Sequence, residues 1–142
     1  MSVRTRVIRK SKSRRLQSEY ERNAKQLVSR AAAMVHATAV QSITDGNKTG
    51  ETYEKYNPRR THRASAAGEP PAADTGYLHN NIFMDIDSDG LGASVESRAE
   101  YSAYLEFGTA NLAARPFMQP AVEANRRAIR DLAVRMIRTR SR

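Results

Sequence analysis

Apolar residues recur at steps of three and four along residues 16–44, a spacing that places them on one side of a helix. Glycine and asparagine in the sequence DGNKTG at 45–50 favour turns and are expected to end this helix. Because much of the stripe is alanine, we expect close packing against a flat partner. The stripe positions are Leu16, Tyr20, Ala24, Leu27, Ala31, Met34 and Val35.

Three later segments have strand patterns. Residues 51–56 predict a short strand, and residues 81–87 and 91–97 alternate apolar with polar positions. The alternation puts Ile82, Met84 and Ile86 on one face. Ser-Asp-Gly separates the last two segments, and its turn chemistry predicts a hairpin.

Residues 57–76 have no apolar period and contain three of the five prolines. Most connections within a domain have about 4–6 residues, so we expect a connection this long to be functional or mobile.

Two helices are predicted near the C-terminus. Residues 99–107 predict a short helix, which Gly108 is expected to end in the left-handed conformation. Pro116 fits the first turn of a second long helix, which we expect to reach about residue 138. We also expect Phe107 and Phe117 to be buried, against each other or against the sheet, because the loop between them returns the chain.

These elements predict an α+β fold: a long N-terminal helix, a small antiparallel sheet with a hairpin, a short helix and a long C-terminal helix. We assign residues 16–138 to a single domain, residues 1–15 to a basic arm and residues 139–142 to a basic tail.

Composition narrows the class of protein. The chain has 142 residues, 39% of them hydrophobic and 6% aromatic, so we expect a thin core that neighbouring molecules help to stabilise. It contains no cysteine, which excludes disulfides, thiolate metal sites and thiol nucleophiles. No apolar run has the roughly 20 residues that span a bilayer, and we expect a soluble intracellular protein, or one assembled inside a cell.

The net charge of +9 is concentrated at the ends. Residues 1–15 hold seven bases and no acid, residues 126–142 hold seven arginines and one aspartate, and residues 16–125 have a net charge of −4. Such arms can neutralise phosphates, contact an acidic neighbouring subunit or remain solvated. The candidates for contact with DNA or a partner are Arg4, Arg6, Arg9, Lys10, Lys12, Arg14 and Arg15 in the arm, and Arg59, Arg60 and Arg63 in the long connection.

One segment matches a metal-binding pattern. Residues 85–96 fit the calcium-loop sequence, with oxygen ligands available from Asp85, Asp87, Asp89 and Glu96. That loop belongs between helices, whereas both flanks here alternate like strands. An acidic hairpin is therefore favoured over a calcium site.

No enzymatic motif is present. His36, His62 and His79 lack metal-ligand spacing, and Ser65 and Ser102 have no histidine at a motif spacing. We find no glycine-rich phosphate loop either. We expect neither an enzyme nor a bound cofactor.

Three blocks together resemble the small tail-completion, or head–tail joining, proteins of long-tailed bacteriophages. They are HRASAAGEPPAADTGYL at 62–78, EYSAYLEFGT at 100–109 and AARPFMQPAV at 113–122. Their order and spacing are preserved, and the resemblance covers residues 20–135. The residues that match the family pattern are Gly68, Pro70, Pro71, Asp74, Thr75, Gly76, Leu78, Tyr101, Tyr104, Glu106, Phe107, Gly108, Thr109, Arg115, Pro116, Phe117 and Pro120.

The resemblance implies a non-enzymatic structural protein of the virion neck, found also in prophages and gene-transfer particles. Such proteins form a ring, commonly six-fold, between portal or adaptor proteins and the tail tube or tail terminator, near the packaged DNA and away from any membrane. They are assembled in the host cytoplasm. The alternative is a small basic nucleic-acid-binding protein of ribosomal type, which the charge of −4 over residues 16–125 disfavours.

Overall fold

The computed structural model describes the backbone of residues 10–138 and the side chains of residues 14–137. The fold is α+β, as predicted. In chain order its elements are α1 (Lys10–Thr44), β1 (Thr52–Tyr56), β2 (Arg59–Arg63), α2 (Tyr77–Asn80), β3 (Ile82–Ile86), β4 (Ala93–Ser97), α3 (Ser102–Phe107) and α4 (Met118–Arg138).

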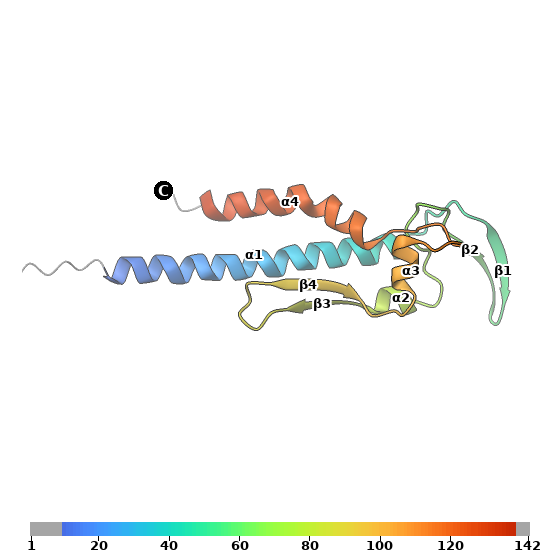
Figure 1. Ribbon diagram of the computed structural model, residues 1–142, viewed down its shortest axis with the longest axis horizontal. Helices are drawn as coiled ribbons and strands as arrows, with labels where there is room; N and C mark the ends of the chain where they lie inside the picture. Colours follow the sequence, from blue (N-terminus) through green and yellow to red (C-terminus); the bar gives the residue numbers. More distant parts are fainter. Residues whose placement is uncertain (1–9, 139–142) are drawn as a thin grey trace, which may run out of the picture.

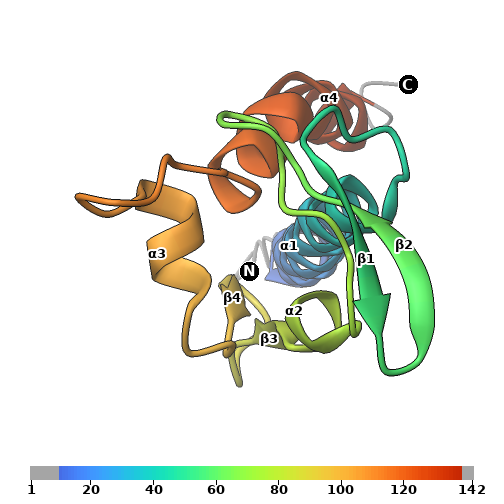
Figure 2. The same ribbon diagram turned by 90° about the vertical axis from the view of Figure 1, so that its right-hand side faces the viewer.

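The molecule is elongated along α1. Helix α4 runs antiparallel to α1 on one side of it, and the β3–β4 hairpin lies on the opposite side (Figure 1). The β1–β2 hairpin, α2 and α3 surround the C-terminal end of α1 (Figure 2). Within the part of the chain that the structure describes, neither long helix has an apolar stretch sufficient to cross a bilayer.

The core lies around the C-terminal half of α1. Ala39 and Ala121 are almost fully buried, and their small side chains let α1 and α4 approach closely. Toward the other end, Leu16 is 41% and Tyr20 52% exposed. The predicted stripe is therefore only partly covered within one chain. The core cluster is Val35, Ala39, Ile43, Leu78, Ile82, Ala99, Phe117 and Ala121.

The first helix begins earlier than predicted, at Lys10 instead of Leu16. Lysine, arginine and serine at 10–15 form helix readily once the following turns are in place. The last part of the predicted arm is thus helical. Arg4, Arg6 and Arg9 lie outside the described residues.

The prediction of a 20-residue connection at 57–76 is wrong. Residues 59–63 form β2, which pairs with β1 in register from Thr52↔Arg63 to Tyr56↔Arg59. The strand predicted at 51–56 is confirmed as β1, whereas no apolar alternation marks β2 in the sequence, because both strands are mostly exposed on both faces. Backbone hydrogen bonds from Gly68 to Ala114 and from Ala73 to Ile43 then hold the rest of the segment in place. The fold consequently has two two-stranded sheets where one was expected.

The hairpin predicted at 81–97 is confirmed, with Met84 opposite Val95. Burial follows the predicted face only at Ile82, which is 4% exposed. Met84 and Ile86 remain 36% and 45% exposed, because the hairpin extends beyond the core along α1.

The turn from α3 to α4 differs from prediction in two details. Gly108 follows α3 with φ 74° and ψ 178°, a region that is essentially restricted to glycine but is not the left-handed helical one. Helix α4 begins at Met118, so Pro116 precedes it and Pro120 lies in its first turn.

Candidate functional site

Glu106, in the second resemblance block, caps the helix that the third block opens. Its carboxylate accepts hydrogen bonds from the backbone N–H groups of Phe117 (2.9 Å), Met118 (3.0 Å) and Gln119 (2.8 Å). The first N–H groups of a helix have no partner inside it, and their partial positive charge favours a carboxylate. Glu106 therefore fixes the start of α4 against α3.

Further backbone bonds join the three blocks. The N–H of Arg115 donates to Leu105 O at 2.6 Å, and the N–H of Gly68 donates to Ala114 O at 2.9 Å. Segments that lie up to about fifty residues apart in sequence thus form one structural unit at the end of α1.

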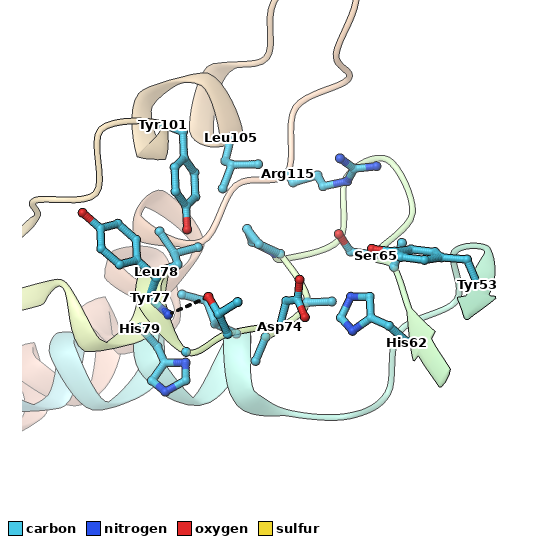
Figure 3. Close-up of a pocket in the computed structure, with 17 residues that line it drawn as sticks. Tyr53, His62, Ser65, Asp74, Tyr77, Leu78, His79, Tyr101, Leu105 and Arg115 are labelled. Carbon is cyan, nitrogen blue, oxygen red and sulfur yellow. Dashed lines mark hydrogen bonds between the residues drawn. The ribbon is translucent and has the colours of Figure 1, made fainter. Parts of the chain in front are cut away.

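This unit encloses a cavity of about 250 Å³. Figure 3 shows the rings of Tyr77 and Tyr101 at one end and those of Tyr53 and His62 at the other, with Asp74 between them. Ring centroids are 6.1 Å apart in the first pair and 5.3 Å in the second. Leu105 and Arg115 of the later blocks complete the wall.

Asp74, in the cavity wall, pairs with two basic side chains. Its carboxylate forms ion pairs with Lys55 and Arg60, one on each strand of the β1–β2 hairpin. The hydrogen bond from Lys55 contributes most to lowering the pKa of Asp74. Burial, with smaller contributions from Tyr77 and Asp74, raises the pKa of Tyr101.

Several polar groups around the cavity have no hydrogen-bond partner among the described residues. Nε of Arg115 and Nδ1 of His79 are buried without one. Ser65 is also buried, at 5% exposure. A bound polar group or water would satisfy these atoms.

Ser65, His62 and Asp74 line the same cavity, which sequence spacing did not reveal. A nucleophilic serine needs a base within hydrogen-bond reach. No hydrogen bond joins Ser65 to a histidine in the described chain, and Asp74 is engaged by Lys55 and Arg60. The residue types of a hydrolase are present, but the arrangement that activates a serine is not.

Glu69 anchors the loop beside the cavity. Its carboxylate accepts hydrogen bonds from the Thr49 hydroxyl, the Thr49 N–H (3.0 Å) and the Ala66 N–H (2.9 Å). These bonds, led by the Thr49 hydroxyl, lower the pKa of Glu69 to about 2. Nearby, Nζ of Lys48 donates to Ser42 O at 2.6 Å, and burial lowers the Lys48 pKa.

The other residues that match the family pattern differ in how deeply they are buried and in which element they lie. Leu78 is in the core, Pro71 is buried, and Gly76 (φ 85°) precedes α2. Phe117 is 1% exposed, as predicted, but Phe107 is 79% exposed, so the expectation that both are buried is wrong. Phe107 is the last residue of α3 and points away from the core, a direction that its neighbours in sequence do not reveal.

The arginines of the predicted basic patch mostly contact partners within the same chain. Arg60 pairs with Asp74, Arg59 with Glu54 at 3.3 Å, and Nε of Arg63 donates to Gly50 O at 3.2 Å. Arg14 and Arg15 are exposed on α1, which also includes Lys10 and Lys12.

The oxygen ligands of the calcium pattern do not gather. Arg98 binds Asp85 at 2.8 Å and Glu96 at 2.6 Å, and Asp89 Oδ1 accepts the Leu91 N–H at 2.8 Å. Residues 14–137 contain no group of three or more side chains placed to hold a metal ion. The segment is an acidic hairpin, as favoured from its sequence.

Comparisons with protein-family models, with curated proteins and with solved structures give no match to this chain.

Proposed function

We propose that this chain is a structural protein of a long-tailed bacteriophage particle. It completes the tail or joins it to the head, as one subunit of an oligomeric ring at the connector. Its partners are further copies of itself, portal or adaptor proteins on the head side, and tube or terminator proteins on the tail side. No catalysis is involved.

The meeting of the three resemblance blocks carries this proposal. Glu106 of the second block caps α4 at Phe117 in the third, and the first block supplies Gly68 and the cavity wall. Their convergence supports a shared architecture with the proteins that they resemble.

The amount of exposed surface also favours an assembly subunit. The molecule is elongated along α1, so its folded part leaves more surface exposed than a compact monomer of similar mass would. Large apolar side chains contribute to this surface, among them Tyr20, Leu91 and Ile137. A subunit that gains part of its burial from neighbours would have these properties.

The rival function is nucleic-acid binding, which needs a basic face on the folded body. The basic cluster at 59–63 does not favour nucleic-acid binding, because each of its arginines has a partner within the chain. These arginines are Arg59, Arg60 and Arg63.

Two measurements test the proposal. Light scattering with size-exclusion chromatography should give a mass several times the 15.9 kDa of one chain. Labelled antibodies against the protein should mark the junction between head and tail in purified particles. A monomer that binds duplex DNA and loses affinity steeply with added salt would support the rival instead.

A further inference from the structure

An apolar groove lies between α1 and α4, away from the core. Its volume is about 510 Å³, and Arg30 and Arg135 line it with exposed side chains. Arg30 forms no ion pair with any described residue. The groove thus combines apolar surface with positive charge. Its remaining lining is Ala33, Met34, Ala37, Ala128 and Leu132.

The tip of the β3–β4 hairpin has complementary properties. Ile86 and Leu91, on either side of the turn, are 45% and 49% exposed. Asp87 and Asp89 lie between them and form no ion pair with a described residue, whereas Asp85 and Glu96 both pair with Arg98. The tip therefore presents two apolar side chains and two carboxylates.

The hairpin cannot fill the groove of its own molecule. Figures 1 and 2 show it along another side of α1, where Val95 lines a separate pocket with Val122 and Ile129 of α4, whereas other residues of α1 and α4 form the groove. Contact between the tip and the groove needs a second copy.

The two features lie at nearly the same height along α1. A Cβ atom at Gly90, in the turn, would lie 3.1 Å from Cγ of Lys25, so the tip is beside Lys25. Arg30 follows five residues later, about 8 Å along a helix axis. Two parallel copies need only a small axial shift to bring tip and groove together.

We propose that the β3–β4 tip of one copy docks in the α1–α4 groove of the next, with Asp87 and Asp89 facing Arg30. Ile86 and Leu91 then cover the alanine-rich floor. This interface rests on the proposed function, since it specifies how ring subunits meet. It joins two different surfaces of the same chain, so it repeats head to tail and closes into a ring if the rotation fits.

Charge reversal tests the docking. Arg30→Glu and the double variant Asp87→Lys/Asp89→Lys each place like charges in contact, and each alone should associate at least about tenfold more weakly than the wild-type chain. Arg127→Glu is the matched control, because Arg127 is an exposed arginine on α4 outside the groove. Circular dichroism and melting curves check that all variants fold, and native mass spectrometry measures association.

Mixing the two reversed proteins is the decisive step. The lysine tip of one then faces the carboxylate introduced by Arg30→Glu in the other, and the aspartate tip of that other faces the unchanged Arg30, so each tip again meets a side chain of opposite charge at position 30. We expect the 1:1 mixture to associate although each protein alone does not. Failure of the folded mixture to associate overturns the docking.

Other outcomes separate the docking from the proposed function. If the wild-type chain and both reversed variants form the same oligomers, the proposed docking interface is wrong, and the proposal of a ring is unaffected. If Arg30→Glu keeps the oligomer but weakens binding to a duplex DNA oligonucleotide, the groove takes phosphate and not a second copy. If the wild-type chain stays monomeric at every concentration, the docking is wrong, and antibody labelling of particles still decides the location.

Discussion

Glu106 supplies a cap that α4 lacks in its own sequence, since Phe117, just before the helix, has no side-chain acceptor. Replacing Glu106 with alanine leaves three N–H groups without this partner. We expect Glu106→Ala to lower the free energy of unfolding by about 1–2 kcal/mol, measured by urea denaturation.

Glu123→Ala is the control for this change. Glu123 is an exposed carboxylate on α4 that pairs with Arg126 at 3.1 Å, and its loss should change stability by less than about 1 kcal/mol. Equal urea midpoints for Glu106→Ala and Glu123→Ala would show that the Glu106 cap contributes nothing to stability.

The two phenylalanines of the return loop should behave differently. Phe117 is 1% exposed, and Phe117→Ala is expected to cost about 3–5 kcal/mol. Phe107 is 79% exposed, and Phe107→Ala in the monomer should cost less than about 0.5 kcal/mol. Thermal melting of both variants checks this difference. A large loss of stability in Phe107→Ala would contradict the exposed position of Phe107.

Glu69 predicts a dependence of stability on pH. Its folded-state pKa of about 2 lies below the ordinary value of 4.5, so its contribution is fully present above 4.5 and is lost as the pH falls through 2. The melting temperature of Glu69→Gln should therefore lie below that of the wild-type chain at neutral pH, and the difference should narrow across this interval. A difference independent of pH would mean that the carboxylate charge is not involved.

At the scale of elements, the connection from α3 to α4 depends on Gly108. A Cβ atom there would lie 2.7 Å from Leu112 O and 2.9 Å from Ala114 N, at a φ of 74° that other residues rarely adopt. We expect Gly108→Ala to destabilise the fold by at least about 1–3 kcal/mol and to weaken the Glu106 cap.

Gly46→Ala is the matched control, because a Cβ atom at Gly46 meets nothing within 4 Å. Chemical denaturation of both variants, with hydrogen exchange at the N–H groups of Met118 and Gln119, separates a local effect on the cap from general destabilisation. Unchanged exchange in Gly108→Ala would contradict the link between turn and cap.

For the whole molecule, shape is the measurable property. Helix α1 has 35 residues and is therefore about 52 Å long, whereas a compact chain of this length has a radius of gyration of about 14 Å. Small-angle scattering at concentrations where the chain is monomeric should give a clearly larger radius. A value near 14 Å would mean that the long helices fold back over the sheets.

Features with local causes could be predicted from the amino-acid pattern alone. Both long helices follow from three- and four-residue spacing, and the β3–β4 hairpin follows from alternation around Ser-Asp-Gly. The need for glycine at position 108 was also evident. Strand β2 was missed because a strand exposed on both faces carries no apolar alternation, and its cause is pairing with β1.

The roles of the predicted residues, in contrast, depend on how the elements pack in three dimensions. Glu106, Phe107 and Phe117 all belong to the family pattern, but the structure gives them different roles. Glu106 caps α4, Phe107 is exposed at the end of α3, and Phe117 is buried in the core. The cavity likewise joins Ser65 to Arg115, fifty residues apart, through a chain path that no local pattern encodes. Spacing along a chain sets which face of an element is apolar, whereas burial depends on what packs against that face.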